Sequence, residues 1–96
     1  MKKRLLGRNP GVIRRRARIL TYIAAHPGST VREITEALWG DRRIRRTATK
    51  TDLKHLAKTG LVTFEWTTGR AGRATKAYCI SDLGQAALSE ELGEGP

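Results

Sequence analysis

Two short stretches in the second half of the chain limit its fold more than any other feature. In residues 61–67, apolar and polar side chains alternate and β-branched and aromatic residues are frequent, which predicts a strand. A second strand is expected over residues 75–80. A loop of glycine and arginine, residues 68–74, joins them into a hairpin. Because two strands cannot form an independent sheet in water, this hairpin must pack on helices.

The residues before the hairpin predict helices with one apolar face each. The first is expected over residues 12–25, where apolar residues recur at steps of three or four. The second is expected over residues 31–39, because Thr30 and Glu33 have the spacing of a capping box. The side chains expected to face the core are Ile13, Ala17, Ile19, Leu20, Ile23 and Ala24 from the first helix and Val31, Ile34, Ala37 and Leu38 from the second.

A third helix is expected to end at residue 59, before a glycine, with an inner face made of Leu53, Leu56 and Ala57. Its start depends on Ile44. Nine steps of about 100° along a helix would place Ile44 opposite Leu53. We therefore expect Ile44 to belong to the preceding turn and the helix to begin near Arg46 or Thr47.

After the hairpin, Ser81 and Asp82 predict the start of a last short helix with apolar positions at Leu83, Ala87 and Leu88. The length of 96 residues argues for one domain. The expected fold class is α+β: a three-helix core with a two-stranded hairpin and a short C-terminal helix. We expect a basic arm over residues 1–11, the folded domain over residues 12–90 and a frayed tail over residues 91–96.

The formal net charge of +10 is spread unevenly along the chain. Residues 1–18 contain eight basic residues and no acid, and residues 42–58 contain seven basic residues against Asp52 alone. The acids gather near the C-terminal end. This asymmetry predicts a polyanionic partner, with nucleic acid first and an anionic membrane second, whereas the plainer interpretation is a basic, soluble surface.

Other functional classes have little support in the sequence. Cys79 is the only cysteine, which favours an intracellular, cytoplasmic protein without a disulfide. No apolar run approaches the roughly 18 residues that a membrane span needs. His26, His55 and Cys79 lack the spacing of metal ligands, and neither a phosphate-binding loop nor an activated nucleophile is evident. We therefore expect no enzymatic activity, no metal and no cofactor.

Three segments together resemble the winged helix-turn-helix transcriptional regulators of bacteria and archaea. They are residues 30–38 (TVREITEAL), residues 47–62 (TATKTDLKHLAKTGLV), preceded by Ile44, and residues 78–88 (YCISDLGQAAL). The resemblance covers about residues 12–90. It departs from the family pattern at residues 40–43, where the turn is about four residues longer than usual.

The resemblance implies that the third helix enters the DNA major groove, with its N-terminal residues nearest the bases. Thr47 and Thr51 are then expected near bases, and Arg45 and Arg46 can reach guanine edges or phosphates. The full set expected on this helix and its turn is Arg42, Arg43, Arg45, Arg46, Thr47, Lys50, Thr51, Lys54 and Lys58. The plainer alternative is an ordinary solvated helix face.

The hairpin loop would act as the wing, placing Arg70, Arg73 and Lys76 at the minor groove or its phosphates, although a plain flexible turn has the same composition. The arm and first helix would add phosphate contacts from Lys2, Lys3, Arg4, Arg14 and Arg15. The arm also suits dimer exchange or RNA contact. Phe64 and Trp66 share one strand face, so they either cover the helices or seat a dimer partner.

The sequence therefore predicts a nucleoid-associated regulator, more often a repressor in such families, that binds specific double-stranded DNA. A homodimer through the last helix is expected, with Leu83, Leu88 and Leu92 as the contact. Two alternatives stay open. One is binding of RNA or of replication and recombination DNA by charge and shape, and the other is a protein-interaction domain with an acidic partner.

Overall fold

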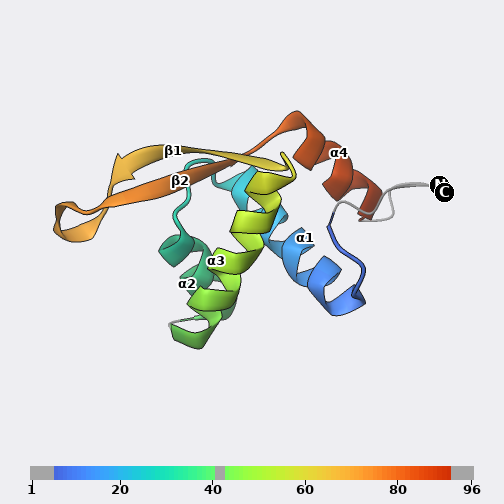
Figure 1. Cartoon of the computed structure of the whole chain (residues 1–96), viewed down its shortest axis with the longest axis horizontal. Helices are drawn as coiled ribbons and strands as arrows, with labels where there is room; N and C mark the ends of the chain where they lie inside the picture. Colours follow the sequence, from blue (N-terminus) through green and yellow to red (C-terminus); the bar gives the residue numbers. More distant parts are fainter. Residues whose placement is uncertain (1–5, 41–42, 92–96) are drawn as a thin grey trace.

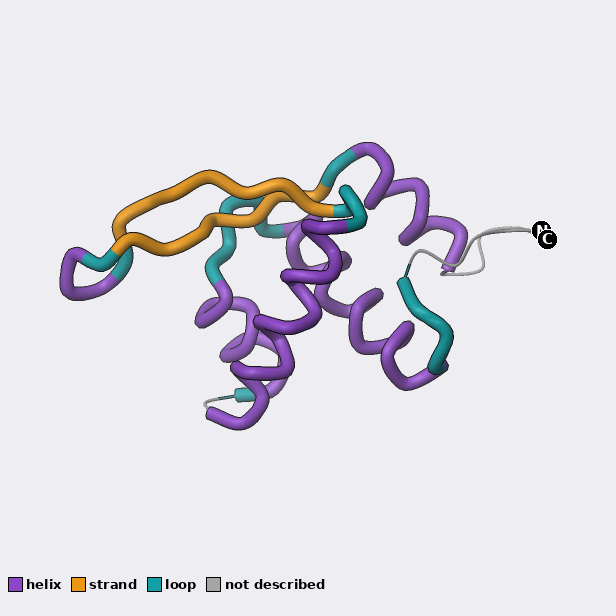
Figure 2. Tube along the Cα trace, in the orientation of Figure 1, coloured by secondary structure: helices purple, strands orange, loops and turns teal. Residues whose placement is uncertain are grey.

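The computed structural model describes residues 6–40 and 43–91 (Figure 1). The elements follow in the order α1 (Pro10–Ala25), α2 (Val31–Trp39), α3 (Arg43–Lys58), β1 (Val62–Thr68), the short 3-10 turn η1 (Arg70–Gly72), β2 (Ala74–Ile80) and α4 (Asp82–Glu91). The predicted α+β class is confirmed, and the arrangement is consistent with a winged helix. Figure 2 shows the hairpin projecting from one side of the helices and α4 lying at the other.

The first helix begins two residues earlier than the apolar pattern predicts. The Asn9 side chain accepts hydrogen bonds from the backbone N–H groups of Gly11 and Val12, at 2.8 and 3.4 Å. Pro10 occupies the first turn, where its missing N–H costs nothing. Residues 9–11, expected at the end of the basic arm, therefore form the N-terminal cap and the first turn of the helix. Just before it, Leu6 is buried in the core.

The predicted bounds and capping box of α2 are confirmed, but one of its expected core residues is wrong. The Thr30 hydroxyl accepts from the Glu33 N–H at 3.2 Å, and the Glu33 carboxylate accepts from the Thr30 N–H at 2.9 Å. Ala37 was expected in the core and is exposed, whereas Thr35 is buried. The Thr35 hydroxyl donates to the Val31 carbonyl at 2.7 Å, so burial leaves no donor unsatisfied.

The prediction for the start of α3 is wrong: the helix begins at Arg43, and Ile44 is helical rather than part of the turn. The prediction assumed that Ile44 must share the inner face of Leu53. Among the residues whose side chains are described, the inner face includes Thr49, Asp52, Leu53 and Leu56, all fully buried. Three arginines, residues with good helix propensity, precede it in α3 and favour a helix over this segment.

The hairpin is antiparallel, and its register pairs Val62 with Ile80 and Thr68 with Ala74. Its base is held by a short third segment, because the Tyr78 N–H donates to the Ser29 carbonyl and the Gly28 N–H donates to the Tyr78 carbonyl, both at 2.8 Å. Leu61, Val62 and Tyr78 are buried at this end. The far end of the hairpin extends beyond the helices (Figure 1).

The last helix packs on α1 through Ala87 and Leu88, which are buried, while Leu83 is 47% exposed. The sequence predicted a homodimer contact from Leu83, Leu88 and Leu92, but Leu88 belongs to the core of the same chain. Leu92, the third residue of that expected contact, lies outside the described residues. A dimer contact on α4 would depend on Leu83.

Candidate nucleic-acid interface

The outer face of α3 carries the polar side chains that the sequence predicted for it. Thr47, Lys50, Thr51, Lys54 and Lys58 are all exposed. The Thr51 hydroxyl donates to the Thr47 carbonyl at 3.1 Å, so its oxygen and methyl group remain available to a partner. Lys50, Lys54 and Lys58 follow one another at steps of four, which places their charges along one line of the helix.

The N-terminal end of α3 presents further arginines. Arg45 is exposed and Arg46 is half-buried, and the Arg46 Nε is a buried donor without a hydrogen-bond partner among the described residues. Arg43 is the first residue of α3, and its side chain, like the whole of Arg42, lies outside the described residues.

The hairpin tip is a shaped turn rather than a plain loop. Gly69 donates its N–H to the Arg73 carbonyl at 2.6 Å, and Ala71 and Gly72 adopt positive φ angles of 60° and 72°. Arg73 is exposed directly before β2. Arg70 lies in η1, with its side chain outside the described residues, and Lys76 turns toward the helices.

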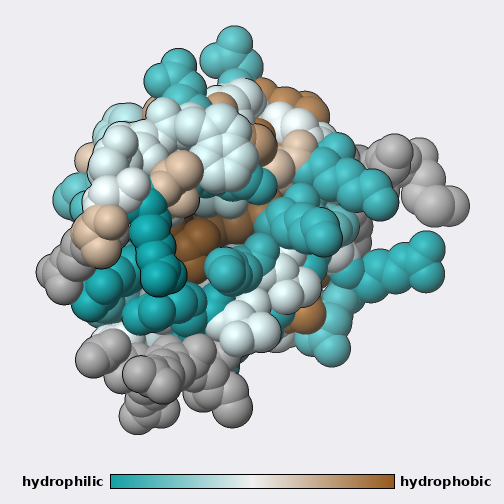
Figure 3. Space-filling model, turned by 60° about the vertical axis from the view of Figure 1, so that its left-hand side comes forward, coloured by the Kyte–Doolittle hydropathy of each residue, from teal (hydrophilic) through white to brown (hydrophobic). Residues whose placement is uncertain are grey.

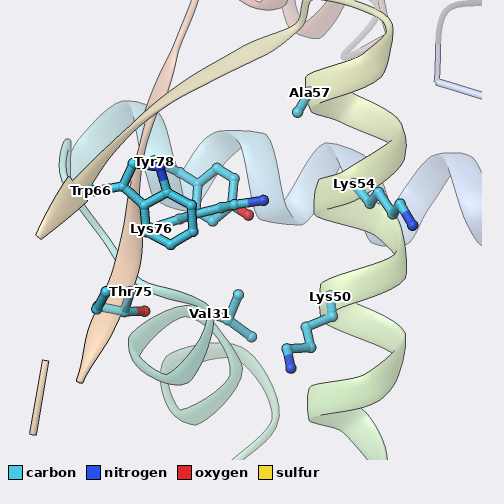
Figure 4. Close-up of a pocket in the computed structure, with 9 residues that line it drawn as sticks. Val31, Lys50, Lys54, Ala57, Trp66, Thr75, Lys76 and Tyr78 are labelled. Atoms are coloured by element: carbon cyan, nitrogen blue, oxygen red, sulfur yellow. The ribbon is translucent and has the colours of Figure 1, made fainter.

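A cleft of about 500 Å³ separates the hairpin from α3, and we call it the α3–hairpin cleft (Figure 4). Three of its lining residues are lysines and none is acidic. Figure 3 shows a hollow on this side of the molecule, with hydrophilic side chains around an apolar floor. The lining residues are Val31, Lys50, Lys54, Ala57, Trp66, Ala74, Thr75, Lys76 and Tyr78.

Aromatic rings form the hairpin wall of this cleft. Trp66 is 65% exposed and meets Phe64 edge-on, with 6.0 Å between ring centroids. The Lys76 ammonium lies 4.4 Å from the Phe64 ring centroid and 5.6 Å from that of Trp66. Burial raises the pKa of the Tyr78 phenol, which stays neutral and uncharged at the base of the wall. The cleft thus combines cations with flat apolar surface.

The arginines of α1 divide into two groups. Arg14 is exposed, as a phosphate-binding residue must be. Arg15 instead binds the Asp52 carboxylate with its Nε and with its Nη2, the latter at 3.0 Å from Oδ1, and Arg16 adds its Nε at 2.9 Å. Donating this hydrogen bond to the Asp52 carboxylate raises the pKa of the Arg15 guanidinium. Lys2, Lys3 and Arg4 lie outside the described residues.

Asp52 is the residue whose role the sequence interpretation missed. Its side chain is fully buried and joins α1 to α3, and Arg16 extends the connection to the Leu6 carbonyl at 2.9 Å. The spacing Thr49, Asp52, Leu53, Leu56 is that of one helix face, so helical periodicity alone places Asp52 beside two core leucines. An acid at such a position, with an excess of arginines nearby in sequence, indicates a buried ion pair.

No protein-family model matches the chain, and comparison with curated proteins finds no relative. Within the described residues, no helix combines the length and apolar character needed to cross a membrane. Across residues 6–40 and 43–91, no group of three His, Cys, Asp or Glu side chains is placed to hold a metal ion.

Proposed function

We propose that this protein binds double-stranded DNA as a small sequence-specific transcriptional regulator, with α3 in the major groove and the hairpin as a wing. The observation that carries the proposal is the exposed face of α3, where two threonines and three lysines lie next to a cation-lined cleft and a projecting hairpin. A major groove about 12 Å wide accepts one α-helix. Threonine hydroxyls and methyl groups suit base edges, and lysines suit phosphates.

The α3–hairpin cleft supports a specific placement of the DNA backbone. A helix in the major groove and a wing at the adjacent minor groove have one sugar-phosphate strand between them. Lys50, Lys54 and Lys76 line the space where that strand would pass. Their ammonium groups would neutralise its phosphates and release counterions, which makes binding dependent on salt.

The test is fluorescence anisotropy with duplexes selected from a random library and with unselected duplex, each over a salt series. Sequence-specific regulation requires a preference of roughly 10³-fold or more at physiological salt. Equal binding of all duplexes, with affinity that collapses as salt rises, would instead favour charge-driven binding of nucleic acid or of an acidic protein.

Lys50→Gln with Lys54→Gln is expected to weaken duplex binding and to lower the slope of log Kobs against log salt by about 1.8, or 0.9 per phosphate contact. Gln85→Glu with Ala86→Glu is the matched control, because it changes net charge by the same amount on exposed positions of α4. The control should keep the wild-type slope. An equal fall in slope for both pairs would mean that net charge, and not this face of α3, governs binding.

Arg73→Gln is expected to reduce duplex affinity severalfold at moderate salt, since one exposed wing cation is lost. Arg8→Gln removes one exposed charge two residues before α1 and should have a smaller effect, because the N-terminal end of α1 lies far from the hairpin tip (Figure 1). The comparison is made by anisotropy on the same duplex. Identical affinities for the two variants would remove the hairpin from the interface.

A further inference from the structure

Trp66 has a position that contact with duplex DNA does not explain. It is the most exposed of the large apolar side chains in the described part of the chain, at 65%. Its neighbour on the same strand face, Phe64, is 38% exposed, so the two rings form one patch. Base pairs inside a duplex have both flat faces covered by their neighbours. Away from the ends of a duplex, a ring on the wall of a cleft therefore finds a free base face only where a base is unpaired.

The groups around Trp66 match the parts of a single nucleotide. A flat ring offers a stacking surface for a base, and Arg- or Lys-type cations offer partners for its phosphate. Lys76 stands beside the ring, at the paired position of β2, and Lys50 and Lys54 lie across the cleft on α3 (Figure 4). The volume of about 500 Å³ falls within the roughly 300–1,000 Å³ of small-ligand sites.

The same charges disfavour a second copy of the chain as the occupant. A two-fold contact through this face would bring each copy's three cleft lysines against those of its partner, because the same patch meets itself. None of the cleft residues is acidic, so nothing in the lining offsets that repulsion. An anionic occupant with an aromatic surface is favoured instead.

We propose that the α3–hairpin cleft binds an unpaired nucleotide of a DNA strand, stacked on Trp66 with its phosphate held by Lys50, Lys54 and Lys76. This rests on the proposed duplex binding, which brings a strand to the mouth of the cleft. The protein then prefers DNA that carries an unpaired base next to a duplex, such as an overhang, a bulge or a locally opened site.

The experiment compares one duplex in two forms, blunt and with a three-nucleotide overhang, by anisotropy at fixed salt. The overhang is expected to improve affinity by roughly 5- to 150-fold, the range found for stacking of one base on an aromatic ring. Trp66→Ala should abolish this gain and weaken blunt-duplex binding far less than overhang binding, and Trp66→Phe should restore part of the gain. Thr67→Ala, on the opposite face of the same strand, is the matched control and should behave as wild type.

Tryptophan fluorescence gives a second measurement. The chain has only two tryptophans, so Trp39→Phe leaves Trp66 as the single reporter. Overhang DNA should quench it and blunt duplex should not. If Trp39→Phe fails to fold, the loss of quenching between wild type and Trp66→Phe reports the same event.

The affinity for blunt duplex tests the proposed function. The increase in affinity produced by the overhang tests whether the cleft binds an unpaired nucleotide. Blunt binding without any gain, or equal weakening of both DNA forms by Trp66→Ala, would overturn the proposal for the cleft alone. Quenching by free nucleoside monophosphate with no gain from the overhang would also overturn it, since the ligand would then be a small molecule. Failure of both DNA forms to bind would overturn the duplex proposal as well.

Discussion

Asp52→Ala is expected to lower the free energy of unfolding by about 3–5 kcal/mol, because it leaves two arginines in a partly buried site without their carboxylate. The Asp52 side chain is fully buried, whereas those of Arg15 and Arg16 are 31% and 12% exposed. Domains of this size have total stabilities of about 5–15 kcal/mol. The change therefore removes a large part of the stability, and urea unfolding followed by circular dichroism measures it.

The matched control is Glu36→Ala, which breaks an exposed ion pair between Arg32 and Glu36, 3.6 Å apart on α2. Exposed pairs contribute roughly 0–1 kcal/mol, so the control should remain close to wild type. Asp52→Asn keeps the shape of the side chain and one oxygen acceptor, so its free energy of unfolding should lie between those of Asp52→Ala and Glu36→Ala. Breaking a buried ion pair usually costs several kcal/mol, so a fall of less than about 1 kcal/mol in the free energy of unfolding of Asp52→Ala would show that this ion pair does not hold α1 against α3.

The anchoring of Asp52 matters for the proposed function because Asp52 lies on the inner side of the same helix that carries Thr51 and Lys54 outward. Two arginines of α1 bind the Asp52 carboxylate on the side of α3 that faces the core. The rotation of α3 about its axis, and with it the set of side chains that reaches a DNA groove, thus depends on an interaction between groups 36 and 37 residues apart.

Gly84→Ala is expected to destabilise the protein by about 1–3 kcal/mol or more, the usual cost of overpacking. A Cβ atom at this position would clash with the Leu61 carbonyl oxygen and would lie 2.7 Å from Ile80 Cγ1. Backbone must move to relieve the first clash. Helix propensity alone predicts the opposite sign, since alanine is favoured over glycine in a helix by about 1 kcal/mol.

Ala86→Gly is the matched control for this prediction, because it makes the reverse change at an exposed position of the same helix. It should cost about 0.5–1 kcal/mol through propensity. Thermal and urea unfolding of the two variants give the comparison. A Gly84→Ala protein as stable as wild type would mean that α4 moves away from Leu61 at little cost, and the close approach would not be needed to place this helix.

Several features of the fold follow from the sequence because they depend on neighbouring residues. The capping box of α2 joins Thr30 and Glu33, three residues apart, and the predicted bounds of that helix agree with the structure. The two strands and their glycine-containing turn were likewise predicted from alternation and turn residues, to within one residue at each strand end. The basic outer face of α3 follows from setting Leu53 inward.

Tertiary packing decided the burial of Thr35 in place of Ala37 and the role of Leu88. In each case the environment of the residue is made by elements distant in sequence. The α3–hairpin cleft belongs to the same class, because its walls come from α2, α3 and both strands, and no local pattern places Trp66 opposite Lys50.

The sequence by itself determined the order of the elements, most of their bounds and the side of α3 that carries positive charge, since periodicity and caps act over a few residues. Only the tertiary structure decided which of the many arginines are available to a partner. A carboxylate fully buried on α3 engages Arg15 and Arg16, whereas Arg14 stays exposed. The physical reason is that desolvating Asp52 requires compensating charge from whatever helix packs against it.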